Sequence, residues 1–139
     1  MAEGVLFDTS ILIPLYNENR YRERVLDLGG RTRLFFSVVA INEFIRGAHD
    51  RRSQNLVRSF LDTVKENLIS PTERQWIECG SVSERILKRE RRSKEKVILL
   101  QNDILIAIGA RDADAILVTA DRNDFTILKE FIDVAVDFW

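Results

Sequence analysis

The stretch "ILVTADRNDF" (residues 116–125) joins a strongly apolar segment to a group of polar side chains. Its first four residues are apolar or carry a hydroxyl, which is typical of a strand buried inside a sheet. Asp121, Asn123 and Asp124 follow almost at once. Such side chains at the end of a strand must be desolvated, used as caps of a turn or helix, or satisfied by an ion. The stretch therefore predicts a buried strand that ends at an acidic edge.

Short apolar runs alternate with helical patterns on either side of this stretch. The predicted strands cover residues 4–8, 33–39, 115–119 and 133–138, with a short extended link at 67–70. Amphipathic helices are predicted over 38–48 and 53–66, and a nearly buried helix over 100–112. Strands separated by helices of this length need crossover connections, which produce parallel pairing. We therefore expect the α/β class: a three-layer α/β/α sandwich with a central, mostly parallel sheet.

Residues with capping side chains mark the expected beginnings of three helices. Thr9 or Ser10 is available as a cap after the first strand, and Ser53 is expected to start the helix over 53–66. In "SPTE", Ser70 is the expected cap, and Glu73 three residues later completes a capping-box signature. Each of these side chains can accept a hydrogen bond from a free amide of a first helical turn.

The composition limits the class of protein. A chain of 139 residues with 45% hydrophobic content can bury one sizeable core but is too short for two ordinary domains, so we expect one domain over 1–139. The net charge of −1 removes the simplest argument for a nucleic-acid binder, although basic patches remain at 48–54 and 88–96. One cysteine and one histidine allow no internal disulfide and no Cys-rich or His-rich metal site. Because no long apolar run or leader pattern occurs, we expect a soluble, cytoplasmic protein without a membrane partner.

Four carboxylates are expected to converge at one edge of the sheet. Asp8 ends the first strand, Asp121 follows the strand at 115–119, Glu43 lies in the helix after the second strand, and Asp103 opens the buried helix. Ligands of open parallel sheets bind outside the carboxyl ends of the strands. Carboxylates gathered there repel one another and raise some of their pKa values, and a hard divalent cation removes that cost. The pattern favours a site for Mg²⁺ or Mn²⁺.

Each acid also has a simpler interpretation. Asp8 could cap a helix, and Asp103 could be a first-turn acid favoured by the helix dipole. Glu43, on a polar helix face, could be solvated, and Asp121 with Asp124 could form an ordinary turn. Only the joint placement of these residues at one sheet edge indicates a functional site.

Four motifs in order resemble those of the PIN-domain ribonucleases, in particular the VapC-like toxins of type II toxin-antitoxin pairs. They are "LFDTSILIPLY", "SVVAINEFIRGA", "NDILIAIGA" and "ILVTADRNDF", and they span nearly the whole chain. The resemblance implies a PIN-like α/β/α sandwich that cleaves RNA phosphodiester bonds with Mg²⁺ or Mn²⁺.

The resemblance also assigns roles to individual residues. The family's four catalytic and metal-binding acids fall on Asp8, Glu43, Asp103 and Asp121. The supporting positions are Ser10 and Thr119, which match small hydroxyl residues that orient the first and fourth acids, and Asp124. Asp112 and Asp114 receive no role.

The implied partners are an RNA substrate, a small cognate antitoxin whose helix lies in a groove of the toxin, and a second copy of the chain in a homodimer. Two alternatives stay open at this point. One is a PIN-domain nuclease that acts in RNA processing without an antitoxin, and the other is a non-catalytic PIN-fold binding module.

Overall fold

The structure, a computed structural model, describes residues 4–90 and 93–139, and within these ranges five strands form one parallel sheet. The strand order is β3-β2-β1-β4-β5. The strands are β1 (Gly4–Phe7), β2 (Arg33–Ser37), β3 (Leu68–Ile69), β4 (Ala115–Thr119) and β5 (Val136–Phe138). β1 lies at the centre, with Leu6 opposite Phe35 of β2 and Leu117 of β4. The predicted parallel sheet is confirmed.

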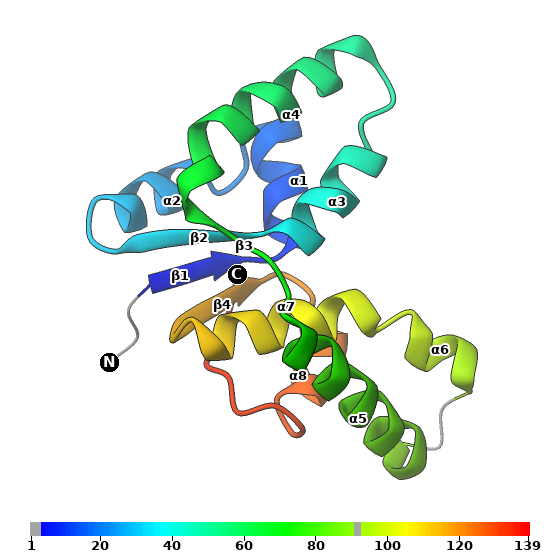
Figure 1. Cartoon of the computed structure of the whole chain (residues 1–139). Coiled ribbons are helices and arrows are strands. Elements are labelled where there is room, and N and C mark those ends of the chain that lie inside the picture. The colour runs from blue at the N-terminus through cyan, green and yellow to red at the C-terminus, as the bar shows by residue number, and fades with distance from the viewer. Residues whose placement is uncertain (1–3, 91–92) are drawn as a thin grey trace.

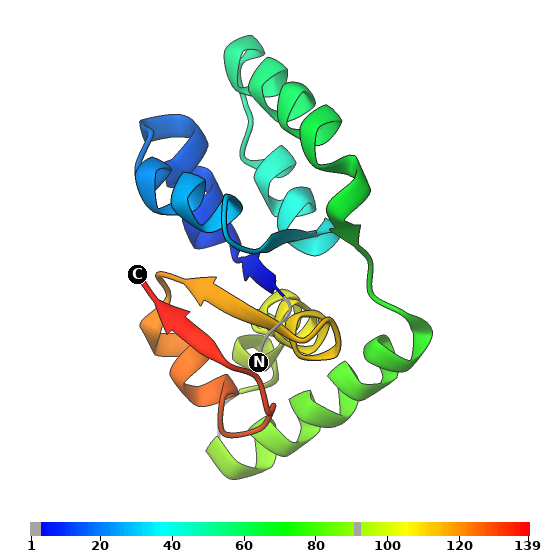
Figure 2. The ribbon, with the colours of Figure 1, turned by 90° about the vertical axis from the view of Figure 1, so that its left-hand side faces the viewer.

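Helices cover both faces of this sheet (Figures 1 and 2). One layer contains α1 (Thr9–Glu18), α2 (Arg22–Gly29), α3 (Val38–Arg46) and α4 (Arg51–Val64). The other contains α5 (Glu73–Glu90), α6 (Lys94–Ile98), α7 (Gln101–Asp112) and α8 (Arg122–Leu128). A single turn of 3-10 helix (Lys65–Asn67) leads from α4 into β3. The predicted three-layer α/β/α sandwich is therefore confirmed.

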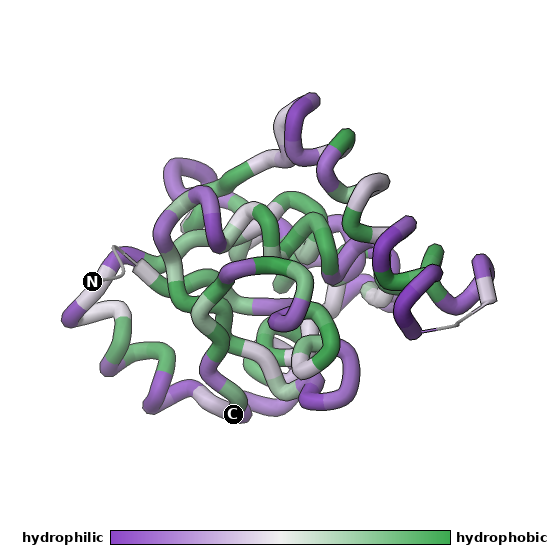
Figure 3. Tube along the Cα trace, turned by 90° about the horizontal axis from the view of Figure 1, so that it is seen from below, coloured by the Kyte–Doolittle hydropathy of each residue, from purple (hydrophilic) through white to green (hydrophobic). Residues whose placement is uncertain are grey.

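The two layers have different cores. On the α1–α4 face, aromatic rings pack in a chain in which Phe36, Phe44 and Tyr16 all contact Phe60, with centroid separations of 5.1, 6.0 and 4.6 Å. On the other face, α7 is buried on nearly every side because almost all of its residues from Ile104 to Ala110 are inaccessible. Figure 3 shows that the hydrophobic segments lie mostly near the centre of the molecule, with hydrophilic segments around them. No helix in the described ranges is both long and apolar enough to cross a membrane.

Three helix starts differ from the sequence prediction, because in each case another side chain accepts the hydrogen bond from a free amide. Asp8, rather than Thr9 or Ser10, caps α1. Asp50 caps α4 by accepting from the Ser53 amide at 2.7 Å, so this helix begins at Arg51. The expected capping box of Ser70 and Glu73 is also wrong. Thr72 and Gln75 form the box instead, each side chain accepting from the other residue's amide, at 3.2 and 3.1 Å.

The remaining differences concern short elements. The last strand covers only Val136–Phe138 of the predicted range 133–138, and the residues before it form its connection to α8. The link at 67–70 contains β3, which pairs with the end of β2. The sequence did not predict α2, which buries no residue completely, or the five-residue α6. The basic run at 88–96 is divided between the ends of α5 and α6, and its residues 91 and 92 lie outside the described residues.

Gly4 permits the close approach of β1 to β2. A Cβ at this position would lie 2.6 Å from the Arg33 carbonyl oxygen and 2.5 Å from the Phe35 ring.

We predict that Gly4→Ala lowers the free energy of unfolding by about 1–3 kcal/mol because the central strands must separate. Urea denaturation measures this change. Gly80→Ala is the matched control, since a Cβ there meets nothing within 4 Å, and we expect it to stabilise α5 by about 0.5–1 kcal/mol. Equal effects of the two changes would contradict the prediction.

Candidate active site

Asp8 lies at the carboxyl end of β1, the central strand, and is 4% exposed. Its Oδ2 accepts hydrogen bonds from the Ser10 hydroxyl at 2.8 Å, the Thr119 hydroxyl at 2.9 Å and the Ser10 amide at 3.4 Å. Its Oδ1 receives none of these three bonds. These three donors fix the orientation of the carboxyl group, so Asp8 presents its second oxygen in a defined direction.

Ser10 and Thr119 connect the carboxyl ends of β1 and β4. Their hydroxyls lie 3.1 Å apart, and the Ala120 amide donates to the Ser10 hydroxyl at 3.0 Å. The Asp121 amide donates to the Thr119 hydroxyl at 3.0 Å. Ser10 and Thr119 therefore both contact the side chain of Asp8, and Thr119 also contacts the backbone of Asp121.

Asp103, Asp121 and Asp124 form a tight group of acids within the part of the chain that the structure describes. One carboxylate oxygen from each lies within 4.8 Å of the other two. Asp121 caps α8 by accepting from the Asp124 amide at 3.2 Å, and Asp103 lies in the first turn of α7. Both helices therefore direct their positive N-terminal ends at the acids. Asp124, expected only to support the site, therefore lies within the same 4.8 Å limit as Asp103 and Asp121.

The environment of Asp103 raises its pKa to about 8. Burial is the largest cause, because desolvation disfavours the charged form, and the charges of Asp8, Glu43, Asp121 and Asp124 add to it. Asp8 and Glu43 are therefore near enough to Asp103 to interact with its charge. The structure thus brings all four predicted acids to one edge of the sheet.

Glu43 occupies the side of the site that α3 provides. Its Oε1 accepts a hydrogen bond from the Thr9 hydroxyl at 3.0 Å. Desolvation raises the pKa of Glu43, the Thr9 hydrogen bond opposes this rise, and the charge of Asp8 adds to it. Thr9 was not predicted as a site residue. Its position directly after Asp8 was the only signal available in the sequence.

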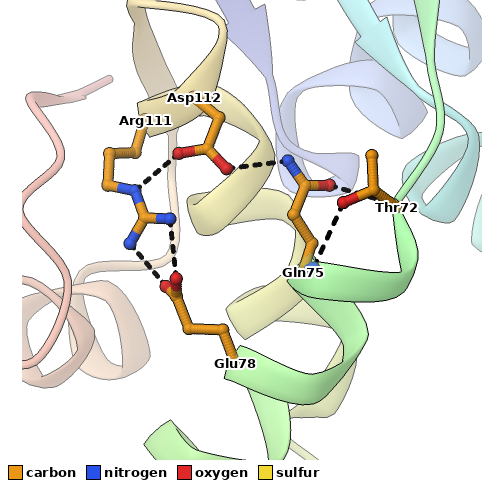
Figure 4. Close-up of polar contacts among 5 residues, drawn as sticks. All are labelled: Thr72, Gln75, Glu78, Arg111 and Asp112. Carbon is orange, nitrogen blue, oxygen red and sulfur yellow. Dashed lines mark hydrogen bonds and ion pairs between the residues drawn. The ribbon is translucent and has the colours of Figure 1, made fainter.

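A second polar network fastens α5 to the far end of α7 (Figure 4). The Arg111 guanidinium donates two hydrogen bonds to Glu78 and one, at 2.8 Å, to Asp112. Gln75 donates to the other oxygen of Asp112 at 2.9 Å. Asp112, which received no role from the sequence, thus helps to hold the helix that carries Asp103.

Fold and site together define a class of protein: an α/β/α sandwich with an acid cluster at the carboxyl edge of parallel strands. Within that class, the model of the PIN domain family matches residues 5–130, which is most of the chain. The chain belongs to the PIN domain family, whose members are nucleases. A search of curated proteins finds no significant match.

Solved structures with the same fold include toxin-antitoxin complexes. VapBC2 of Rickettsia felis, bound to a DNA fragment from its promoter, matches with a TM-score of 0.73 and 19% identity over 97% of this chain and 98% of the other. VapBC-1 of nontypeable Haemophilus influenzae matches with a TM-score of 0.70 and 24% identity over 97% of both chains. DNA-bound VapBC of Salmonella typhimurium gives a TM-score of 0.70 at 14% identity over 98% of both chains.

The raised pKa of Asp103 predicts a dependence of stability on pH in metal-free protein. The folded state holds a proton on Asp103 up to about pH 8, whereas the unfolded chain releases it near pH 4. The stabilising contribution is complete below about pH 4 and is lost as the pH rises through about 8. We expect the melting temperature in EDTA to fall over this range. For one proton, the free energy of unfolding falls by at most about 1.4 kcal/mol per pH unit.

Thermal unfolding of the wild type and Asp103→Asn at a series of pH values measures this effect. The asparagine cannot ionise, so its profile should be flatter. Glu43, whose pKa is also raised, contributes to the slope that remains. Parallel profiles for the two proteins would show that Asp103 is not the group responsible.

Proposed function

We propose that this protein is an endoribonuclease that depends on Mg²⁺ or Mn²⁺ and acts as the toxin of a type II toxin-antitoxin pair. The single observation that carries the proposal is the convergence of Asp8, Glu43, Asp103 and Asp121, from four separate elements, at one edge of the sheet. Membership of the PIN domain family and the shared fold with VapBC complexes support the choice of reaction and of partner.

The donor set fits a hard divalent cation. Its side-chain ligands are carboxylate oxygens, which Mg²⁺ and Mn²⁺ prefer. The burial of Asp103 among four other carboxylates gives the site a charge that a cation would relieve. Asp8, Asp103 and Asp121 are the residues that would hold such an ion, and Asp124 lies close enough to join them.

When bound, the cation supplies a water that is activated at neutral pH and neutralises charge that develops on the phosphate. The side chains of this protein complete the site around it. Ser10 and Thr119 hold Asp8 in one orientation, which keeps its free oxygen directed for binding. Glu43 accepts a hydrogen bond from Thr9, and its pKa is raised. It can therefore accept a proton from the attacking water or help to hold a second ion.

Cleavage of a fluorophore-labelled single-stranded RNA, with Mg²⁺ or Mn²⁺ and with EDTA, tests the proposal. We expect EDTA to abolish cleavage and Asp103→Asn to reduce it by at least about 100-fold, since loss of even a residue behind the ligands costs about 10- to 100-fold. Asp103→Asn should fold normally because the wild-type carboxyl is already neutral at pH 7 in the metal-free state. Asp114→Asn, at an exposed acid after α7, is the control and should cleave like the wild type.

Two results would overturn the proposal. Cleavage that continues unchanged in EDTA would exclude dependence on a metal. Equal cleavage by Asp103→Asn and the wild type would exclude this acid cluster as the active site. If the protein cleaves none of a broad pool of cellular RNAs, the alternative of a non-catalytic binding module is favoured.

The groove between α1, α2, β2 and α4 is the surface that we propose for the antitoxin helix. It has a volume of about 440 Å³. Apolar side chains such as Leu15, Tyr16, Val25 and Phe36 line it, together with Thr63 of α4. An amphipathic helix can place its apolar face into a groove of this kind. We further propose that a second copy of the chain covers the exposed Ile98 and Leu99, which lie at the end of α6.

The antitoxin proposal predicts a specific loss of binding when charge enters the groove. Thr63 is exposed, so Thr63→Arg should leave the fold intact while weakening co-purification of the small protein encoded beside this chain by at least about tenfold. Asp62→Arg, on the neighbouring exposed position outside the groove, is the control. If no adjacent reading frame encodes a protein that binds, the alternative of an RNA-processing nuclease without an antitoxin replaces this part of the proposal.

A further inference from the structure

Aromatic side chains gather around the carboxyl end of β5, directly beside the acid cluster. Phe138 is paired in register with Thr119, the residue whose hydroxyl contacts Asp8. The Trp139 amide donates to the Thr119 carbonyl at 3.0 Å. Both aromatic residues are only partly buried. Each forms a backbone contact with Thr119 of β4, the strand that ends just before Asp121. Because successive residues of a strand point to opposite faces of a sheet, Phe138 lies on the side of α8 and Trp139 on the side of α2. The two partly exposed rings therefore flank the carboxyl end of the sheet from its two faces.

Arginine side chains lie over both of these rings. The Arg122 guanidinium is 5.1 Å from the centre of the Phe138 ring, and the Arg24 guanidinium is 4.7 Å from the centre of the Trp139 ring. Arg122 directly follows Asp121 in the chain. Both arginines are exposed, and neither forms an ion pair with a residue in the ranges 4–90 and 93–139. Their charges are therefore available to an anionic ligand.

Tyr21 extends this group on the side of α2. Its ring centre is 5.5 Å from that of Trp139. Its backbone has a φ of 66°, in the left-handed region that bulky residues seldom adopt. A hollow of about 440 Å³ next to it is lined by Asn19, Tyr21, Arg22 and Arg24, with Glu23. The chain thus holds Tyr21 in an unfavourable backbone conformation that places its ring beside Trp139 and next to a basic hollow.

We infer that Tyr21, Arg24, Arg122, Phe138 and Trp139, here termed the aromatic–arginine strip, bind single-stranded RNA that approaches the acid cluster. This inference rests on the proposed function and names the surface that recognises its substrate. Aromatic faces stack with unpaired bases whatever their sequence, and guanidinium groups bind phosphates and stack on the same bases. A duplex hides its bases, so the strip favours a single strand.

The electrostatics of the site support an RNA ligand at this position. The acids at the end of the sheet repel a phosphate backbone, and the whole chain has a net charge of −1. An RNA strand therefore needs local positive charge beside the acids to approach them. Arg122 and Arg24 provide that charge, and the aromatic rings add an attraction that salt does not screen.

Anisotropy of a fluorescein-labelled oligouridylate, measured in EDTA so that no cleavage occurs, tests the inference. We expect the double variant Arg24→Gln/Arg122→Gln and the single variants Phe138→Leu and Trp139→Leu to weaken binding by about 5- to 100-fold each, the range for loss of one stacked base. Arg33→Gln is the matched control. Its guanidinium lies 4.8 Å from the Phe35 ring, but at the start of β2, at the opposite edge of the sheet.

A second set of measurements separates stacking from packing and from charge. Trp139 also contacts the buried Phe7, with ring centres 5.7 Å apart, so Trp139→Leu can destabilise the fold. Two conservative variants, Arg24→Lys and Trp139→Phe, separate these effects. The first keeps the charge but loses the planar group, so it should weaken binding of the single strand and leave weak binding of an RNA duplex unchanged. The second should restore most of the affinity that Trp139→Leu loses.

The outcomes distinguish this inference from the proposed function. If the strip variants bind RNA as tightly as the wild type and Arg33→Gln do, the strip is a packing cluster and the inference is wrong, even if the protein cleaves RNA. If strip-dependent binding is observed but no metal-dependent cleavage, the inference stands and the proposed nuclease activity fails. Absence of RNA binding by the wild type would overturn the inference outright.

Discussion

The confinement of Asp103 among other carboxylates is the constraint on which the rest of the structure depends. With a pKa of about 8, its carboxyl keeps a proton at pH 7 that the unfolded chain would release, which costs on the order of 4 kcal/mol of stability. The helix that carries it offsets this cost, because Ile104, Ile106 and Ile108 are completely buried, and each such side chain stabilises the fold by about 1.5–3 kcal/mol. Arg111 and its partners hold the opposite end of the same helix. The nearly uniform hydrophobicity of α7 is thus what allows an acid to remain where other acids repel it.

The structural and functional interpretations of the acids are compatible. Asp8 and Asp121 are helix caps, and Asp103 lies in a first turn, as the simpler interpretations required. The same residues lie together because three helices begin at the carboxyl edge of a parallel sheet. Free amides at these helix ends favour negative charge, so capping and clustering reinforce each other. The hydrogen bonds and dipoles of these helix ends therefore offset part of the repulsion among the clustered carboxylates before any ligand is present.

The sequence predicted the sandwich and the positions of the four acids because both depend on chain order. Strands that alternate with helices must pair in parallel, and their carboxyl ends must then meet. The sequence could not show that Asp124 would join the tight group or that Thr9 would contact Glu43, because side-chain directions depend on packing. The proximity of Tyr21 to Trp139 depends on the pairing of β5 and on a left-handed residue, neither of which has a local signal. The shifted capping box shows the same limit, since two competing acceptors lay within three residues of each other.

The pairing of β1 with β4 also determines when the site can exist during synthesis. Thr119 reaches across 111 positions of sequence to orient Asp8, and Asp121 and Asp124 follow it. A growing chain that has not yet released β4 from the ribosome has its first acid but no complete cluster. The acid centre therefore assembles only after most of the chain has emerged, and fragments that end before β4 lack it however well their helices form.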